Sequence, residues 1–521
     1  MKSNDSLVNA VFFENKKGKT FQDSLEMSNE IKLFKESLHR KGYLNPNIEL
    51  IKKNDTNFSI KLIKEKQHTH ITLIFNDLTK SKKIKQQKTT IPIYILEKKL
   101  QNIVKNLESE GATFSRVKLA NIRSIDHKLI ADVIIDPSRK RTIDKVIIGP
   151  YENFPNRYIK HYFKIKKGKT TYNLEKTKNI SQQSKLLNFA SEIKKPETLF
   201  SKDSTNLYLY LKQIKGNKFD GVLGFGNNKE KKGIQFNGHI DIELLNTFNK
   251  GEKFKLKWSR NNTELEKLHT KIISPYVFNS RITSKIKFEL KKQDSTFINT
   301  KAQIQLETSL GKNQNIGILV NQTKSSALRT TAKNDMESFK TRSYGFSYTN
   351  SSFIKKNKIN TEILIEYGIK HTALEEIPQT RSTASITLTT PIKGIRNYFI
   401  KNVTKFLNSD KQNTNELYIT GGANSLRGFN EDSILSSGFN YTNSEIRFRT
   451  SETSYLYSFL DAGIFINKIT QTLTKLYGLG AGYTFKTKNG NLDLSYGLGN
   501  NTNEKLDLQK GIFHIKTTID F

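Results

Sequence analysis

Residues 282–290 read ITSKIKFEL, and this stretch shows most clearly the pattern that recurs through the second half of the sequence. Its even-numbered positions hold Ile, Ser, Ile, Phe and Leu, whereas its odd-numbered positions hold Thr, Lys, Lys and Glu. A period of two places alternate side chains on opposite faces of a sheet. The stretch is therefore expected to be a β-strand with one apolar face and one charged face.

The same alternation recurs after residue 217, for example in 254–258 (FKLKW), 445–449 (EIRFR) and 513–521 (FHIKTTIDF). A soluble sandwich or propeller with one wet face is the alternative. However, 35% hydrophobic residues, arranged one in two, supply only a single apolar skin. A closed barrel in lipid needs only an outer skin, because its lumen can be polar. At roughly 19 residues per strand and turn, residues 217–521 are expected to form an all-β transmembrane barrel of about 16 antiparallel strands.

Before residue 217, helical and strand patterns alternate. We expect three α+β units, at residues 1–66, 67–139 and 140–216, each with the order β-α-α-β-β. The pattern of the first unit lacks an opening half, so this unit is expected to be partial or divergent. In the third unit a helix is expected to begin at Pro155, a second to cover about 173–190, and a strand at 207–211 to close the unit. Three unrelated α+β domains are the simpler alternative.

Charge and cysteine content limit the environments and partners that the chain is expected to have. Lys and Arg total 86 against 49 Asp and Glu, which gives a formal net charge of +37, and there is no cysteine. A disulfide framework is excluded. Basic runs such as 80–88 could bind nucleic acid, but the positive residues are spread along the chain. For these positive residues, a role in the barrel lumen or at lipid headgroups is favoured. Residues 1–21 lack a signal-peptide pattern, so an export signal is expected upstream.

Three patterns near the C-terminus occur in a fixed order: 421–429 (GGANSLRGF), 459–463 (FLDAG) and a terminal strand that ends in Phe521. Together they resemble the BamA/TamA superfamily of outer-membrane insertases and exporters. In that family a long loop folds back into the barrel lumen, and an arginine at its tip meets an aspartate on the wall. The resemblance implies a lumen-inserted loop at 421–440. It assigns the loop tip to Arg427, Gly428 and Phe429, and the lumenal partner to Asp461 with Phe459 and Gly463.

Elementary chemistry agrees with the placement of Asp461. Leu456, Leu460 and Ile464 occupy the opposite face of its strand. Since a carboxylate facing lipid is costly, Asp461 is expected to point into the lumen. A guanidinium is the best two-pronged partner for it there.

The resemblance also implies how such a barrel would handle other proteins. The three α+β units would be periplasmic POTRA domains, which bind unfolded clients partly by β-augmentation. The first strand, at 219–226, contains Gly221, Gly224 and Gly226, and glycines weaken a strand interior. A seam at this strand, where a client strand pairs, is one interpretation, and an ordinary glycine-rich strand is the other. The C-terminal β-signal is assigned to Phe513, Ile515, Ile519 and Phe521.

No catalytic, metal or cofactor motif stands out. Residues 478–482 (GLGAG) superficially resemble a dinucleotide loop, but a strand pattern follows where a helix would be needed. We therefore expect a non-enzymatic factor without cofactor or metal. It would insert or translocate proteins at the outer membrane of a Gram-negative bacterium, with its N-terminal domains in the periplasm.

Within the family, the TamA-like subgroup is preferred over BamA because of the three units. The alternatives are a two-partner-type secretion exporter and, from another class, a passive porin-like channel. The expected partners are unfolded outer-membrane or secreted clients, membrane lipids including lipopolysaccharide-type headgroups, and an accessory subunit at the POTRA domains, but no nucleic acid.

Overall fold

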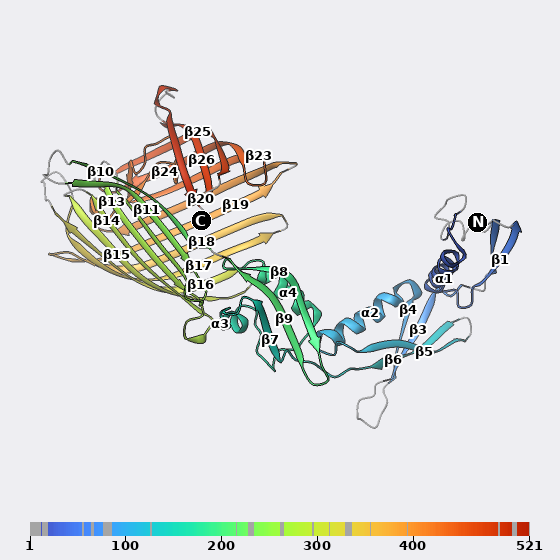
Figure 1. Ribbon diagram of the computed structural model, residues 1–521. Helices are drawn as coiled ribbons and strands as arrows, with labels where there is room; N and C mark the ends of the chain where they lie inside the picture. Colours follow the sequence, from blue (N-terminus) through green and yellow to red (C-terminus); the bar gives the residue numbers. More distant parts are fainter. Residues whose placement is uncertain are drawn as a thin grey trace. The chain divides into compact units, whose positions relative to one another are not determined.

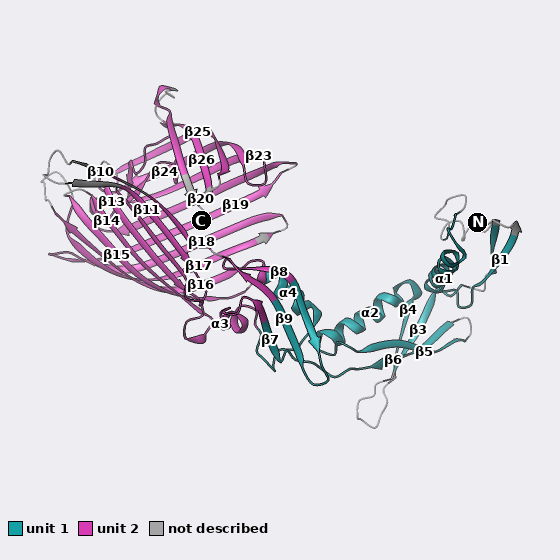
Figure 2. Cartoon of the chain, viewed as in Figure 1, with its two compact units in different colours: residues 1–147, 165–183, 195–209 teal, residues 148–164, 184–194, 210–521 magenta. Residues whose placement is uncertain are grey.

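The computed structural model describes residues 12, 19–54, 57–63, 67–76, 86–125, 128–214, 216–227, 234–260, 265–293, 296–311, 313–328, 336–354, 356–392, 394–487, 490–502 and 508–519. The chain forms two compact units, coloured separately in Figure 2. Unit 1 comprises residues 1–147, 165–183 and 195–209, and unit 2 comprises residues 148–164, 184–194 and 210–521.

The first elements of unit 1 are a helix and a hairpin (Figure 1). Helix α1 covers Ser24–Arg40, and strands β1 (Asn47–Asn54) and β2 (Asn57–Ile63) pair antiparallel. Asp23 caps α1 by accepting a 2.7 Å hydrogen bond from the Glu26 backbone N–H. The apolar stripe of the helix packs with the hairpin in a core of Phe12, Phe34, Leu38, Tyr43, Ile60 and Leu62.

A four-stranded sheet of order β4-β3-β6-β5 follows. Its elements are β3 (His70–Asn76), β4 (Gln86–Pro92), α2 (Ile93–Ser109), β5 (Arg116–Ile125) and β6 (Lys128–Asp136). The core contains Ile71, Leu73, Ile93, Leu129, Ala131 and Val133. The expected order β-α-α-β-β is wrong for the described residues here, because strand β4 stands before the single helix α2. The polar sequence of β4 hides it from pattern analysis, and as an edge strand it needs no apolar face and tolerates Pro92.

The next elements are β7 (Lys145–Pro150), α3 (Asn156–His161), α4 (Leu174–Ser184), β8 (Ala190–Phe200) and β9 (Thr205–Gln213). This segment has the order β-α-α-β-β, with a sheet of order β7-β9-β8. Pro155 is the residue that precedes α3 rather than its first helical residue. The expected helix over 173–190 is too long, and β8 was not expected. Pro196 argues against a strand, yet β8 lies at the sheet edge, where a missing N–H costs no ladder bond.

The remainder of unit 2 consists mainly of one large antiparallel sheet, which has sixteen strands among its described residues (Figure 1). Each strand pairs with the next along the sheet, and the expected strand number is confirmed. The strands are β10 (Lys218–Asn227), β11 (Ile234–Leu245), β12 (Lys253–Arg260), β13 (Leu265–Ser274), β14 (Ile282–Gln293), β15 (Phe297–Ser309), β16 (Gln314–Ala327), β17 (Phe339–Ile354), β18 (Asn357–His371), β19 (Glu376–Pro391), β20 (Arg396–Ser409), β23 (Gly438–Arg449), β24 (Tyr455–Asn467), β25 (Thr472–Thr487), β26 (Gly490–Asn501) and β27 (Ile512–Ile519).

The sheet has its apolar face outside and its polar face inside. On β15, Gln303, Gln305 and Glu307 are buried, whereas Ile304 and Leu306 between them are 55% and 39% exposed. A water-soluble sheet would show the reverse. Outward apolar side chains recur around the sheet, at Ile318, Tyr344, Ile365, Ile386, Leu460 and Ile515 among others.

The two ends of the strand order meet. Strands β10 and β27 lie in contact, so the sheet closes into a barrel. No hydrogen-bonded ladder joins β10 to β27 among the residues that the structure describes, whereas every other neighbouring pair has one. The junction of the first and last strands is therefore the weakest join of the barrel.

Residues 410–437 connect β20 to β23. They contain the short 3₁₀ helix η3 (Thr414–Glu416) and a hairpin of β21 (Tyr418–Thr420) and β22 (Ile434–Ser436). The connection thus begins at residue 410, before the expected start at 421. It ends at residue 437, three residues before the expected end at 440, because β23 begins at Gly438. We call residues 410–437 the lumen loop.

Residues 148–164 pack on two turns at the barrel end where β10 begins. The Tyr151 hydroxyl donates a 2.8 Å hydrogen bond to the Asn249 Oδ1 and accepts one from the Asn246 Nδ2. The rings of Tyr158 and Tyr276 meet edge to face, with their centroids 5.0 Å apart. The turn at 275–281 therefore marks one mouth of the barrel. No helix within the described part of the chain is both long and apolar enough to span a membrane.

We expect the detergent-solubilised protein to migrate differently on gels before and after boiling. A closed barrel whose backbone hydrogen bonds are nearly all internal resists unfolding by detergent until it is heated. Gel electrophoresis of boiled and unboiled samples measures this directly. Identical mobility of the two samples would contradict closure.

Candidate functional site in the barrel lumen

Arg427, in the lumen loop, forms a two-pronged ion pair with Asp461 on β24. The Arg427 Nη2 donates to the Asp461 Oδ1 at 2.7 Å, and the Nε donates to the Oδ2 at 2.8 Å. The Arg427 backbone N–H also donates to the Oδ2, at 3.1 Å. Arg427 is 6% exposed and Asp461 is 0% exposed. The carboxylate is therefore fully occupied by the loop tip.

A second carboxylate completes the surroundings of the Arg427 guanidinium. Its Nη1 donates to the Glu445 Oε1 at 2.7 Å, and the Arg447 Nε donates to the other oxygen of Glu445 at 2.7 Å. The guanidinium carbon lies 3.8 Å from the centroid of the Phe459 ring. Burying charges is costly, and it is tolerated when each charge is paired and hydrogen-bonded, as here.

The backbone of the loop tip lies against glycines of β25 and β26. Gly428 has a φ of +87°, which favours glycine, and a Cβ on it would lie 2.5 Å from the Gly499 backbone nitrogen. A Cβ on Gly478 would lie 2.0 Å from the Arg427 carbonyl oxygen. Gly497 faces Gly428 in the same way. These glycines leave the space that the tip fills.

The tip also reaches the last strand. The Gly428 backbone N–H donates a 3.0 Å hydrogen bond to the Nε2 of His514, which is 6% exposed and lies on β27. An accepting imidazole nitrogen carries no proton, so this bond needs His514 in a form with a bare Nε2. The loop tip is thus tied to the strand that borders the weak join.

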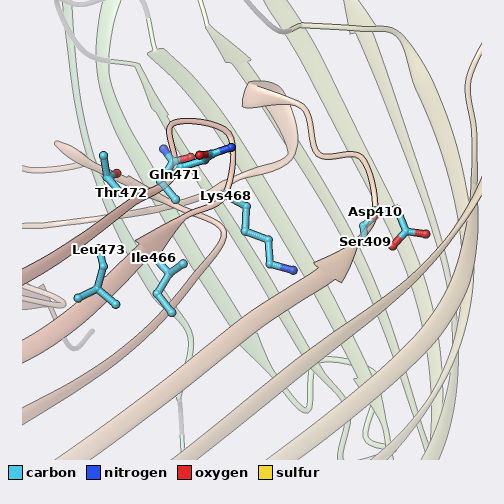
Figure 3. A pocket seen from close by; sticks show the side chains of 8 residues that line it. Ser409, Asp410, Ile466, Lys468, Gln471, Thr472 and Leu473 are labelled. Carbon is cyan, nitrogen blue, oxygen red and sulfur yellow. The ribbon is translucent and has the colours of Figure 1, made fainter.

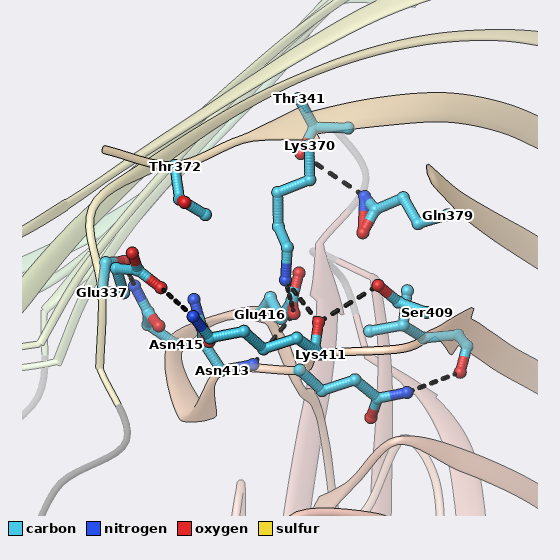
Figure 4. A network of polar contacts seen from close by, with 12 residues as sticks. Glu337, Thr341, Lys370, Thr372, Gln379, Ser409, Lys411, Asn413, Asn415 and Glu416 are labelled. Carbon is cyan, nitrogen blue, oxygen red and sulfur yellow. Dashed lines mark hydrogen bonds and ion pairs between the residues drawn. The ribbon is translucent and has the colours of Figure 1, made fainter. Parts of the chain in front are cut away.

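A second anchor holds the start of the loop, as Figure 4 shows. The Lys370 Nζ on β18 is completely buried, and it donates to the Glu416 Oε1 at 2.8 Å and to the Lys411 carbonyl oxygen at 2.6 Å. The same Glu416 oxygen accepts the Asn413 backbone N–H at 2.9 Å, which closes a capping box on η3.

Further contacts spread the loop across the lumen. The Asn415 Nδ2 donates to the Ser325 Oγ on β16 at 2.6 Å, and the Asn299 Nδ2 on β15 donates to the Asn415 carbonyl oxygen. Asp432 pairs with Lys267 on β13. One loop is therefore bonded to strands on opposite sides of the barrel, so it occupies the lumen as a plug.

Small and shallow cavities lie near the loop. Two cavities of about 180 Å³ each lie beside it, and one of them is lined in part by Lys401, Arg427 and Lys516. A larger open depression of about 500 Å³, shown in Figure 3, lies at the ends of β20 and β24. It is lined by Ser409, Asp410, Ile466, Asn467, Lys468, Gln471, Thr472 and Leu473.

The other expected site residues lie as follows. Phe513 and Ile515 point outward from β27 with 58% and 64% exposure, and Ile519 lies in the same strand. Phe521 falls outside the described residues. Gly463 lies on β24, against the Phe465 ring and Tyr441. Gly221, Gly224 and Gly226 lie in β10, which borders the join. The structure does not bring these groups to the loop tip.

Sequence reasoning missed the roles of Glu445, His514 and the glycines of β25 and β26. A signal was present for the glycines, because 478, 480 and 482 share one strand face, as do 497 and 499. Two neighbouring strands with glycine rows on the inward face indicate that another segment lies against them. The contact with the loop tip thus accounts for a glycine in the dinucleotide-like stretch at 478–482.

We expect Arg427→Ala to lower the free energy of unfolding by about 3–5 kcal/mol, because Asp461 and Glu445 would keep buried charges without their partner. Urea-induced unfolding of the purified protein in detergent measures the change. The exposed loop residue Asn430 supplies the control, since Asn430→Ala should change little. Equal stability of the two variants would refute the structural role of the pair.

We also expect Gly478→Ala to displace the loop tip, since the new methyl group would collide with the Arg427 carbonyl. Limited trypsin digestion reports this, because cleavage after Arg427 requires the tip to leave its buried position. Gly311→Ala is the control, as a Cβ there meets no atom within 4 Å. Protection of Arg427 in both variants would show that the glycines do not seat the tip.

Comparison with known proteins identifies the fold. No family model matches the sequence, and no curated protein matches it. Among solved structures, BamA from Haemophilus ducreyi lacking POTRA domains 1-3 is 13% identical with a TM-score of 0.51, over 81% of this chain and 92% of that chain. CdiB from Acinetobacter baumannii is 14% identical with a TM-score of 0.57, over 96% and 100%. CdiB from Escherichia coli is 11% identical with a TM-score of 0.57, over 100% of both chains. The chain therefore has the fold of BamA and CdiB.

Proposed function

We propose that this protein moves other polypeptides into or across the outer membrane of a Gram-negative bacterium, without covalent chemistry. The observation that carries the proposal is a barrel whose lumen is plugged by a loop held by a buried ion pair. Within the described residues, the join between β10 and β27 also has no hydrogen-bonded ladder. Such a barrel is closed at rest but can open at one defined place.

The outward face of the sheet supports a membrane location. Its large apolar side chains, such as Ile318 at 65% exposure and Leu460 at 56%, form a skin that suits lipid. The buried polar face suits a hydrated lumen. In the part of the barrel that the structure describes, neighbouring strands pair their backbones everywhere except at the join between β10 and β27, as a bilayer requires.

The α+β units before the barrel would be periplasmic POTRA domains that receive unfolded clients. Their sheets end in edge strands such as β4 and β8, to which an extended client segment could add as a further strand. A client strand would then pair with the edge of β10 or β27. The glycines at 221, 224 and 226 lower the stability of β10 and so ease the parting of the join.

The lumen loop argues against a passive porin. A porin conducts small solutes through an open lumen, whereas this lumen is crossed by bonds from Arg427, Asn415 and Asp432 to several strands. Solute passage would require these bonds to break.

Two versions of the function differ in the fate of the client. A TamA-like factor would insert clients into the membrane, and a two-partner-type exporter would pass them to the outside. The likeness to CdiB extends over the full length of the Escherichia coli protein and of this chain, which favours the exporter. The number of N-terminal units underlies the TamA-like prediction.

Reconstitution into liposomes tests the proposal. We expect liposomes with the wild-type protein to increase either the folding of an added unfolded barrel client or the protease-protected uptake of a secreted client, relative to empty liposomes. Arg427→Ala should reduce this gain, while Asn430→Ala should keep it. Large steady ion conductance with no effect on any client would instead indicate a channel.

A further inference from the structure

Three lysines form a row on the inner wall of the barrel. Lys255 on β12 lies directly opposite Lys271 on β13, and Lys271 lies directly opposite Lys287 on β14. Like charges in directly opposed positions destabilise a sheet, because the side chains stand only about 5 Å apart. The fold therefore keeps an unfavourable arrangement in this place.

Lys255 and the neighbouring Lys285 have acidic partners, whereas the other two members of the row do not. Lys255 pairs with Glu243 at 2.6 Å, and Lys285 pairs with Glu307 at 2.5 Å. Neither Lys271 nor Lys287 has an ion pair within the described part of the chain, and both are half-buried. Two neighbouring ammonium groups thus remain unneutralised.

The wider surroundings bring both carboxylates and further lysines near these two ammonium groups. Lysines 255, 285 and 287 repel the Lys271 ammonium, whereas Glu362 attracts the ammonium groups of both Lys271 and Lys287. Glu289, the nearest carboxylate along the chain from Lys287, lies 3.3 Å from the His269 Nδ1 and is partly occupied by it. The row is therefore a local excess of positive charge on the inner wall of the barrel.

The row lies between the lumen loop and one mouth of the barrel. The loop reaches β13 at Lys267, nearer the start of that strand, whereas Lys271 is close to the turn at 275–281. On β14, Lys287 likewise lies in the half that follows this turn. This is the mouth at which residues 148–164 pack, so a chain that enters there meets the row before it meets the loop.

We propose that Lys271 and Lys287, with Lys255 beside them, form a docking site for an acidic segment of a client polypeptide at the mouth of the lumen. This rests on the proposed function and adds the chemistry of the client segment to it. Successive side chains on one face of an extended segment stand about 7 Å apart. Flexible lysine stems can match carboxylates at that spacing, and each new pair would relieve the repulsion within the row.

Binding of defined peptides to the full-length protein in detergent tests the site. The probe is a fluorescently labelled peptide of alternating Glu and Ser, and the comparison peptide has Gln in place of Glu. We expect only the Glu peptide to bind, and binding should weaken as salt is added. The double variant Lys271→Gln/Lys287→Gln should bind about tenfold more weakly, whereas Lys271→Arg/Lys287→Arg should retain binding.

A matched control removes the same charge from the other face of the sheet. Lys292 and Lys324 have the outward parity of Leu290 and Ile318, so Lys292→Gln/Lys324→Gln should leave binding unchanged. Equal weakening in both double variants would reveal only an effect of net charge and would overturn the site. Binding of tripolyphosphate without binding of the Glu peptide would assign the row to phosphate ligands and would also overturn the proposal.

The outcome is separable from that of the proposed function, because peptide binding in detergent needs no client transport. Binding that depends on the row, in a protein that moves no client in liposomes, would refute the transport function alone. Transport without row-dependent binding would refute the docking site alone. Unboiled gel mobility verifies that each variant is folded.

Discussion

The buried ion pair between Arg427 and Asp461 is the interaction on which the organisation of the lumen depends. The two residues lie 34 positions apart in the sequence, and their ion pair joins the lumen loop to the barrel wall. Both oxygens of the aspartate accept hydrogen bonds from the arginine. Charges at this depth need complete pairing, and Glu445 and the Phe459 ring provide the remainder. With the tip seated in this way, the backbone of Gly428 can lie against Gly499 and can reach His514 on the last strand.

The barrel sheet is apolar on its outer face and polar on its inner face, and this distribution explains why such a site can exist. The outward face is apolar and the inward face is rich in Gln, Ser, Glu and Lys, so the interior of the barrel can hold matched charges that an oily core would reject. The same polar wall holds the second anchor of the loop, at Lys370 and Glu416. It also exposes the lysines that remain unmatched near the mouth. The plug and the proposed client path are thus consequences of one distribution of side chains.

Much of this fold follows from local patterns, and the remainder depends on pairing between distant segments. Period-two alternation predicts the strands of the barrel and the inward direction of Asp461, because it is a property of each strand alone. The contact of Glu445 with Arg427, and the fit of Gly478 against the loop, depend on register and loop path, which no short window contains. Strand β8 was missed because Pro196 argues against a strand unless its edge position is known. The loop motif could be assigned only through a family resemblance.

A double-mutant cycle on Arg427 and Asp461 tests the central claim most directly. The unfolding free energies of the wild type, Arg427→Met, Asp461→Leu and the double variant in detergent together isolate the interaction between the two side chains. We expect a coupling energy of about 2 kcal/mol or more, with the double variant more stable than the sum of the single losses implies. A coupling energy near zero would mean that the loop is not held by this pair, and the description of the plugged lumen would then be wrong.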